Sequence, residues 1–328
     1  LHVIKKKLFF FILFIMSKTN SKIFYQLTDQ VVGQGATSTV YKAFNTAAPD
    51  DATYACKVIS KKSLSLEELA NVRKEISILK HFNINSSTKS SNIVTAHSIA
   101  EDANNIYLFM DLVQGEDMCT FIDNYYNEHQ CGLPEKEAFN YFSQMVESVK
   151  QCHQHGVTHR DVKLENFLLD KKQNTIKLAD FGLSDFLHTQ SGQKVEKLHT
   201  KYCGSAAYAC PELISRKPYK GKPVDVWALG IVLFCLLQGW FPFGTVASPT
   251  GQERVNSMFE QIINAPVEFQ QPISKEARQL ILSMLAKDPN DRPTIEQIEQ
   301  SSFFNKYKNP PPPPQAAASS WVMIDDYY

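Results

Sequence analysis

The sequence predicts an α+β fold made of a smaller β-rich part and a larger, mainly helical part. Its length of 328 residues allows about two domains or one two-part unit. Short runs of β-branched and aromatic residues, separated by turns, fill most of the first third. Helical patterns dominate the rest, and one of them is apolar on nearly all sides.

The composition excludes several classes of protein. The 34 Lys and Arg residues balance 34 Asp and Glu residues, so the chain lacks the basic excess of nucleic-acid binders. Hydrophobic residues make up 43% and charged residues 21%, as in a globular chain with a sizeable core. We therefore expect neither global disorder nor a nucleic-acid partner.

The seven cysteines are odd in number and irregularly spaced, and no two of them form a C-x-x-C pair. This spacing indicates neither a disulfide framework nor a zinc site. The sequence therefore predicts reduced thiols and a cytoplasmic or nuclear location.

Residues 1–23 form a separate N-terminal segment. Lysines at 5–7 precede an apolar run at 8–16, as in a short signal peptide, but no small-residue cleavage site follows. The run is too short to cross a hydrocarbon core of about 30 Å. Three interpretations remain: a reading frame extended upstream of a start at Met16, a membrane-contacting segment, and a signal. We favour the first, leave the segment out of the fold prediction and expect no membrane contact.

The following part of the chain predicts strands and one helix. Residues 25–42 indicate a strand, a glycine turn and a second strand, and residues 54–59 and 106–113 indicate two more strands. A polar loop is expected at 83–91. The helix before this loop has apolar residues at steps of three and four: Leu66, Leu69, Val72, Ile76 and Leu79.

Three later segments predict helices. Residues 137–156 carry apolar residues on one face and end at Gly156, a typical helix stop. Residues 224–239 are apolar nearly all round, which indicates a buried core helix rather than a membrane span. Residues 275–287 predict a further helix.

The composition changes at Asn305, and five consecutive prolines occupy 310–314. A tail of this kind cannot bury enough surface to fold alone, so residues 305–328 are predicted to be disordered with a polyproline II segment. Such a segment fits the aromatic grooves of SH3 and WW domains. The alternative, which we favour, is a solubilising spacer.

A glycine turn and a lysine suggest a phosphate site. Gly33 and Gly35 lie between two predicted strands, where the lack of Cβ lets backbone N–H groups close over phosphates. Lys57 can neutralise phosphate oxygens if an acid such as Glu75 holds it. Taken alone, these residues are weak evidence: an ordinary hairpin turn is favoured for the glycines, and a strand-edge lysine and a solvated glutamate are common.

Two short strings are more specific. HRDVKLEN precedes an apolar strand, and DFG follows the run IKLA. They place Asp161, Asn166 and Asp180 on loops at strand ends, where oxygen ligands and bases suit magnesium and phosphate chemistry. Chance alone rarely produces both strings in this order.

With these motifs, the chain resembles the eukaryotic protein kinases over about residues 24–304. The resemblance implies a bilobal protein kinase fold. A small antiparallel β lobe with one regulatory helix would cover about 24–112, and a larger, mainly α-helical lobe about 113–304. The resemblance also places Asp225 and Trp227 on a buried helix that anchors the catalytic loop. It further implies an ion pair between Glu212 and Arg292.

The resemblance implies ATP and Mg²⁺ as cofactors, protein substrates, and transfer of the γ-phosphoryl group to a Ser or Thr hydroxyl. Asp161 would accept the hydroxyl proton, and Lys163 would offset phosphate charge. Asn166 and Asp180 would hold magnesium. The implied cofactor site comprises the glycine turn (Gly33, Gly35), the lysine pair (Lys57, Glu75), the adenine slot (Val40, Ala55, Leu168), the gatekeeper Met110, the hinge backbone (Asp111 to Val113) and Asp180.

Finer features narrow the class. Lys163, two residues after Asp161, is typical of serine/threonine kinases, and the strings YACKVI, MDLVQGEDM and CGSAAYACPEL resemble the calcium/calmodulin-dependent and AMP-activated group. Glu116 and Glu165 match positions where basophilic relatives hold substrate arginines, which predicts basic residues upstream of the acceptor. The alternative to an active enzyme is a pseudokinase or scaffold that acts by binding through the kinase-like surface and the proline-rich tail.

The chain departs from the family pattern near the activating position. Lys201 stands where related kinases carry the activating threonine, and Thr200 lies one residue earlier. Arg160 implies a basic pocket that attracts negative charge. Three alternatives arise: Thr200 takes over, an acid such as Glu196 substitutes, or Lys201 points to solvent and packing orders the loop. We favour Thr200. Ser38 replaces the third glycine of the glycine turn.

Overall fold

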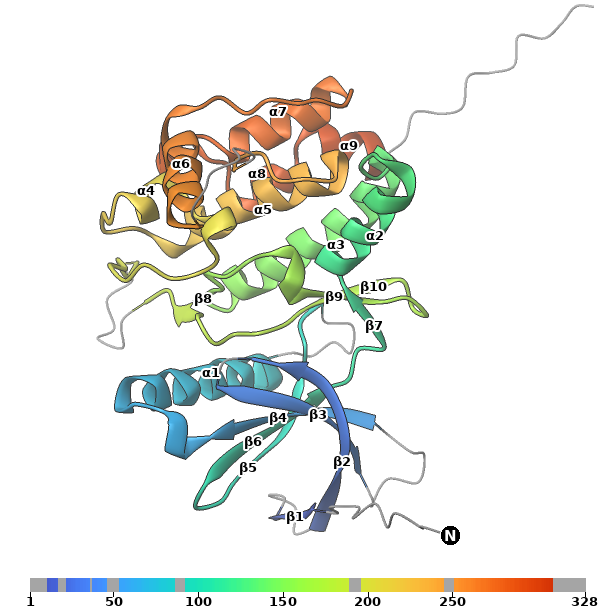
Figure 1. Cartoon of the computed structure of the whole chain (residues 1–328), viewed down its shortest axis with the longest axis vertical. Helices are drawn as coiled ribbons and strands as arrows, with labels where there is room; N and C mark the ends of the chain where they lie inside the picture. The colour runs from blue at the N-terminus through green and yellow to red at the C-terminus, as the bar shows by residue number, and fades with distance from the viewer. Residues whose placement is uncertain are drawn as a thin grey trace, which may run out of the picture.

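The computed structural model has two lobes joined by short connections (Figure 1). It describes residues 11–16, 22–35, 37–45, 53–85, 92–188, 196–244 and 251–308. The smaller lobe is an antiparallel sheet with one long helix, and the larger lobe is mainly helical. The predicted bilobal α+β fold is confirmed.

The sheet of the N-lobe has the strand order β1-β2-β3-β4-β6-β5, and every pair in it is antiparallel. Its inner strands β4 and β6 pair Cys56 with Phe109, and both side chains are fully buried. Because successive side chains alternate between faces, Lys57 points to the opposite face of β4, toward the C-lobe. The strands are β1 (Phe11–Met16), β2 (Lys22–Gln34), β3 (Ser38–Asn45), β4 (Thr53–Ser60), β5 (Ala96–Glu101) and β6 (Asn105–Asp111).

The sheet begins earlier in the chain than expected. β1 pairs with the start of β2, from Phe11 opposite Leu27 to Met16 opposite Lys22. The basic and apolar composition of residues 1–23 led us to leave this segment out of the fold. A short run of aromatic and β-branched residues also suits an edge strand, and composition alone does not separate the two.

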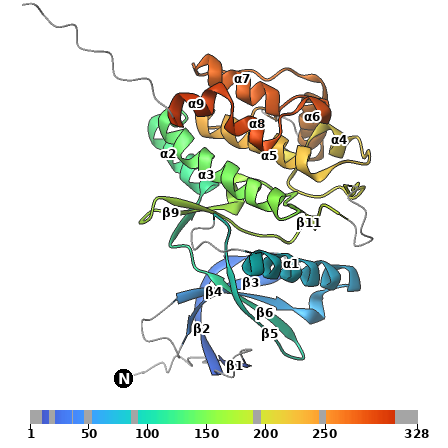
Figure 2. The same ribbon diagram turned by 180° about the vertical axis from the view of Figure 1, so that it is seen from behind.

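The predicted helix of the N-lobe is α1 (Leu66–Asn85). It starts with a reciprocal cap: the Glu68 N–H donates to Ser65 Oγ (3.2 Å), and the Ser65 N–H donates to Glu68 Oε2 (2.7 Å). Ile76 packs on Ile59 of β4 in a small buried cluster, which holds the helix against the sheet. The opposite side of α1 faces the C-lobe in both views (Figures 1 and 2).

The C-lobe is built around α5 (Gly221–Gln238), whose middle residue Trp227 is fully buried. Among the described helices, α5 alone is long and apolar enough to cross a membrane, but 89% of it lies inside the fold. It is therefore the predicted core helix. The helices around it are α2 (Met118–His129), α3 (Glu135–Gln154), α4 (Pro211–Ile214), α6 (Gly251–Asn264), α7 (Lys275–Met284), α8 (Ile295–Glu299) and α9 (Ser302–Lys308). Short 3₁₀ turns are η1 (Lys61–Ser63), η2 (Leu164–Asn166), η3 (Ala206–Tyr208) and η4 (Pro289–Asp291).

Five helices, α2, α4, α6, α8 and α9, were not predicted from the sequence. Met118 and Ile122 are the buried residues of α2, and Ile262 is the buried residue of α6. Both helices carry apolar residues at steps of three and four: Met118, Phe121, Ile122 and Tyr125 in α2, and Val255, Met258, Phe259 and Ile262 in α6. This period is a helix signal that the prediction missed. α2 starts at a local signal, because the Asp117 carboxylate accepts from the Thr120 N–H at 2.9 Å.

Two small sheets lie between the lobes. At Gly115 the connecting strand passes so close to the Leu169 carbonyl that a side chain would collide with it. The three-stranded sheet has the order β10-β9-β7, and the two-stranded sheet pairs β11 with β8. Their strands are β7 (Gly115–Asp117), β8 (Val157–Thr158), β9 (Phe167–Asp170), β10 (Thr175–Leu178) and β11 (Asp185–Phe186).

The ordered fold extends beyond the boundary expected at residue 304. α9 runs to Lys308, and Tyr307 stacks on Phe139 of α3 with ring centroids 5.2 Å apart. The Tyr307 hydroxyl also donates to Glu135 Oε2 (2.8 Å). This packing extends the helix into residues that composition assigned to the tail. Residues 310–314 and most of the predicted loop at 83–91 lie outside the described residues.

Candidate active site

A cleft of about 730 Å³ opens between the two lobes. Residues of β2, β3, β4 and α1 line it on the N-lobe side, and residues near β9 and β10 line it on the C-lobe side. Each residue predicted for the cofactor site lies on its wall, together with Asn166. Asp161 and Lys163 are not among the lining residues and lie beside the cleft.

The outer part of the cleft is a slot between apolar side chains. Val40 and Ala55 lie on β3 and β4, and Leu168 lies on β9 of the other lobe. The glycine turn closes over this slot, with the Gly35 N–H donating to the Ser38 carbonyl at 2.9 Å. A flat apolar slot with polar groups at its edge suits a purine ring.

The hinge between the lobes starts at Asp111, the last residue of β6. Its N–H donates to the Thr95 carbonyl (3.0 Å), so it is not free for a nucleotide. Its carboxylate faces Lys177 (2.8 Å) and His97 (2.7 Å). Burial raises the pKa of Asp111, but these two partners hold the net pKa well below its usual value. The Asp111 N–H therefore does not bind adenine. The predicted hydrogen bonds to adenine are left to the hinge backbone groups that follow it, up to Val113.

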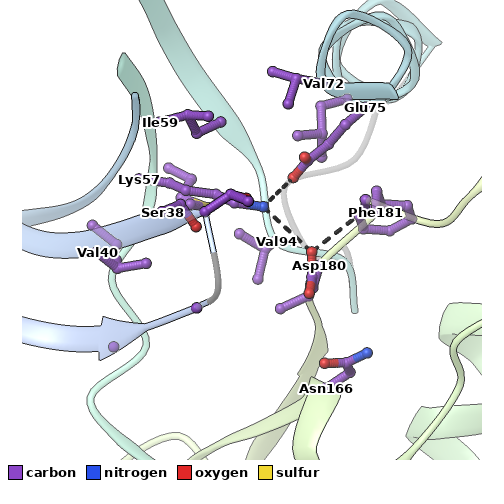
Figure 3. A pocket seen from close by; sticks show the side chains of 18 of the residues that line it. Ser38, Val40, Lys57, Ile59, Val72, Glu75, Val94, Asn166, Asp180 and Phe181 are labelled. Carbon is purple, nitrogen blue, oxygen red and sulfur yellow. Dashed lines mark hydrogen bonds and ion pairs between the residues drawn. The ribbon is translucent and has the colours of Figure 1, made fainter. Parts of the chain in front are cut away.

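Lys57 stands at the centre of the inner cleft (Figure 3). Its ammonium nitrogen lies 2.7 Å from Glu75 Oε1 and 3.3 Å from Asp180 Oδ1, so the predicted pair with Glu75 is present. Burial lowers the pKa of Lys57, but attraction to Glu75 and Asp180 outweighs it and the net pKa is raised. The lysine therefore stays charged at neutral pH and is held in place from α1.

Asp161 has partners on both sides of its loop. Lys163 Nζ lies 2.8 Å from Asp161 Oδ2, and the Asn166 amide donates to the same oxygen at 3.2 Å. Lys163 Nζ also donates to Ser205 Oγ at 3.1 Å. The three predicted catalytic residues thus form one hydrogen-bonded group.

The donor set at the floor of the cleft fits magnesium. The Asp180 side chain is 53% exposed and opens toward the cleft, and Asn166 lies below it (Figure 3). Burial raises the pKa of Asp180, but Lys57 and His159 lower the pKa by a larger amount. The net pKa therefore lies below its usual value, and the carboxyl is ionised. Among the described residues, no three His, Cys, Asp or Glu side chains cluster as a metal cage. Mg²⁺ needs no such cage, because it binds through one or two oxygen ligands plus phosphates and water.

A fully buried carboxylate anchors the Asp161 loop. Asp225 of α5 accepts from the backbone N–H groups of His159 (3.0 Å) and Arg160 (2.7 Å). Arg160 has φ of +61°, a left-handed conformation that a non-glycine residue adopts only when its surroundings hold it. His153 of α3 also bonds to Asp225 (2.9 Å), a contact that the sequence did not indicate.

Comparison with known proteins decides the family. A family model described as the protein kinase domain matches residues 26–304. The chain belongs to the protein kinase family. The kinase is 33% identical over 282 residues to CBL-interacting protein kinase 5 of Oryza sativa subsp. japonica, covering 86% of the chain and 56% of that relative. It is 35% identical over 277 residues to CBL-interacting serine/threonine-protein kinase 15 of Arabidopsis thaliana, covering 84% of the chain and 60% of that relative.

A third relative is the probable serine/threonine-protein kinase HSL1 of Saccharomyces cerevisiae. It is 35% identical over 217 residues, covering 66% of the chain and 13% of that relative. The kinase thus spans little more than half the length of the two plant relatives and a small part of the yeast one. The predicted likeness to serine/threonine protein kinases is confirmed.

The activation segment of the kinase, residues 180–212, is described except at 189–195. Lys201 points to the surface and pairs with Glu67 of α1 at 2.6 Å. Thr200 is exposed. The guanidinium of Arg160 pairs with Asp185, at 3.7 Å, and among the described residues it forms no ion pair with Glu196, the acid suggested as an alternative.

Glu116 and Glu165, the predicted contacts for substrate arginines, each have a partner within the chain. Lys171 Nζ lies 2.5 Å from Glu116 Oε1, and the Tyr208 hydroxyl donates to Glu165 Oε2 at 3.0 Å. The Lys171 side chain is 58% exposed. A substrate cation would therefore have to displace Lys171 or share Glu116 with it.

The predicted pair of Glu212 with Arg292 is present and buried. The two guanidinium nitrogens donate to the two carboxylate oxygens at 2.7 Å each, and Arg292 is 1% exposed. Arg292 also lies over the Trp227 ring, 5.0 Å from its centroid. This contact fastens the end of the activation segment to α5.

Proposed function

We propose that this kinase is an active enzyme that transfers the γ-phosphoryl group of ATP to Ser or Thr hydroxyls of protein substrates. The observation that carries the proposal is that Glu75 and Asp180 hold Lys57 inside the cleft. Beside the cleft, Lys163 holds Asp161. Phosphoryl transfer depends mainly on positioning and charge stabilisation, which this arrangement supplies.

Each residue then has a role at a stated group. Lys57 offsets the charge of the α- and β-phosphates. Asp161 orients the substrate hydroxyl and accepts its proton, and Lys163 offsets charge on the group in transfer. Asn166 and Asp180 are the oxygen ligands for magnesium, which neutralises phosphate charge when bound.

The second candidate is a pseudokinase or scaffold that binds partners without transferring phosphate. The intact lysine and both aspartates favour the enzyme. The test is to incubate the purified full chain with Mg-ATP and a mixed library of Ser, Thr and Tyr peptides. We expect label on Ser and Thr, abolished by Lys57→Met and unchanged by Lys62→Met, an exposed lysine of η1. Nucleotide binding with no labelled peptide would favour the pseudokinase.

We also propose a preference for basic residues before the acceptor. Support comes from the carboxylates of Glu116 and Glu165; the partner of Glu116, Lys171, is exposed enough to move aside. A charge-assisted hydrogen bond is worth about 1.5–3 kcal/mol. Positional peptide arrays should show upstream Arg or Lys, weakened by Glu116→Gln and unaffected by Glu128→Gln on the exposed side of α2. An array without upstream basic preference would contradict the proposal.

A further inference from the structure

Asp185, the first residue of β11, faces three cations. Its Oδ2 atom lies 3.0 Å from Lys197 Nζ, 3.4 Å from Lys74 Nζ and 3.7 Å from Arg160 Nη2. Its Oδ1 atom accepts a hydrogen bond from the Phe186 N–H at 2.9 Å. The side chains of Asp185 and Arg160 are 11% and 8% exposed, so their interaction is weakly screened, whereas Lys74 and Lys197 are 28% and 39% exposed.

The three cations come from three parts of the kinase. Lys74 lies on α1, next to Glu75, and Arg160 lies in the loop immediately before Asp161. Lys197 belongs to the activation segment. Figure 2 shows β11 beside α1 at the boundary of the lobes. The Asp185 carboxylate therefore contacts Lys74 and Arg160. These are the chain neighbours of Glu75 and Asp161, two residues that the proposed reaction uses.

The charges in this cluster do not balance without Asp185. Among the described residues, Lys74, Lys197 and Arg160 form no other ion pair. His199 Nδ1 accepts from Arg160 (3.1 Å), and burial together with Arg160 lowers the pKa of His199 to about 4, so it adds no charge at neutral pH. Removal of the carboxylate would leave three like charges that repel one another.

Other contacts tie α1 to the C-lobe, but at different places along the helix. Near its end, Phe82 packs on Phe181 with ring centroids 5.2 Å apart. At its start, Glu67 pairs with Lys201 at the exposed surface. The contact of Lys74 with Asp185 lies between them, in the helical turn that carries Glu75, the partner of Lys57.

We propose that Asp185 is a positioning residue that fixes α1 and the catalytic loop relative to each other. It touches neither reactant and acts through Lys74 and Arg160. The inference rests on the proposed function only for its effect on rate. Its effect on structure can be measured whether or not the protein transfers phosphate.

The first experiment is hydrogen exchange with mass spectrometry on the full chain. Asp185→Asn keeps the shape of the side chain and removes its charge. We expect exchange to increase more in peptides of α1 and of residues 196–202 than in the rest of the chain, together with a lower unfolding temperature. The control is Glu101→Gln, which breaks the pairs with Lys61 of η1 and Arg73 of α1 but lies wholly in the N-lobe. Unchanged exchange in Asp185→Asn, or the same pattern in the control, would overturn the proposal.

The second experiment measures rates of peptide phosphorylation. We expect kcat of Asp185→Asn to fall at least about tenfold, with recovery in Asp185→Glu and little change in the control. Lys74→Met should also lower kcat, and the double variant should lose less than the product of the two single losses. If the loss of kcat in the double variant equals the product of the two single losses, Asp185 does not act through Lys74. A wild-type chain without activity would refute the proposed function, and the exchange experiment would still decide on Asp185.

Discussion

Among the described residues, the side-chain partners of the Asp161 carboxylate contact one of its oxygens, Oδ2. Oδ2 faces Lys163 and Asn166, whereas Oδ1 faces Gly204, where an added Cβ would lie 3.5 Å away. Gly204 has φ of +92°, a conformation that side chains rarely adopt. A side chain at this position would therefore be strained and would contact Oδ1.

Asp161→Asn should therefore lower kcat by about a hundredfold or more, because the amide cannot accept the proton. The KM for ATP should change little, since Asp161 is not among the residues that line the cleft. Steady-state kinetics on a folded variant measure both. Retention of more than about a tenth of the activity would show that another group is the base.

His199 makes the stability of the kinase depend on pH. Its folded pKa of about 4 lies below the usual value of 6.5, so between these values the unfolded chain binds a proton that the folded chain does not. The free energy of unfolding should fall as the pH drops through this window. At pH 5 the loss from this group is about 2 kcal/mol relative to pH 7.

The test is urea unfolding of the wild type and of His199→Asn at pH 7 and pH 5. The Asn oxygen can accept from Arg160 but does not titrate. The variant should lose less stability than the wild type on acidification, and the other histidines cancel in the comparison. Equal losses in both proteins would be the contrary result.

At the scale of elements, one buried ion pair joins α4 to α5 and η4. Arg292→Met should cost about 3–5 kcal/mol, because it leaves the Glu212 carboxylate buried without its partner. Arg73→Met, whose pair with Glu101 is half exposed, should cost about 1 kcal/mol or less. Urea unfolding of the two variants gives both values. Similar costs would show that Glu212 finds water or another donor.

The sequence predicted elements well where a periodic or charged pattern is local. α1, α3, α5 and α7 carry their apolar stripes within one stretch of chain, and all four are present. α2 and α6 also carry a local apolar period and were missed, and α4 and α8, which were missed too, are only 4 and 5 residues long. α9 was also missed, because the order at its end comes from contacts of Tyr307 with Phe139 and Glu135, which lie far away along the chain.

At the scale of the whole molecule, the cleft takes its walls from both lobes. A ligand that binds only this folded arrangement stabilises it by mass action, by about 2.7 kcal/mol at a concentration 100 times its Kd. Mg-ATP should therefore raise the unfolding temperature, and EDTA should remove the magnesium-dependent part.

Asp180→Asn should abolish most of that magnesium-dependent shift, because it replaces an ionised ligand with a neutral amide. Asp123→Asn, an exposed residue of α2, should keep the full shift. Thermal unfolding with and without EDTA measures both variants. A full magnesium-dependent shift in Asp180→Asn would show that the metal is held elsewhere.

The residues of the site that belong to family motifs could be predicted from the sequence. Those motifs identified Lys57, Glu75 and Asp180, which the structure brings together. The motifs did not identify Asp185. Its partners Lys74, Arg160 and Lys197 lie in three different parts of the chain, and no sequence spacing links Asp185 to them. Such a cluster exists only after the lobes have packed together.

The pair of Lys201 with Glu67 gives the kinase a sensitivity to ionic strength. Both side chains are largely exposed, at 66% and 72%, so dissolved ions can reach them. The Debye length falls from about 10 Å at 0.1 M salt to about 3 Å at 1 M, which weakens exposed pairs far more than buried ones. Raising KCl should therefore loosen the link between the activation segment and α1 in the wild type. In Lys201→Met, hydrogen exchange at residues 196–202 should no longer respond to salt, whereas an unchanged response would place the sensitivity elsewhere.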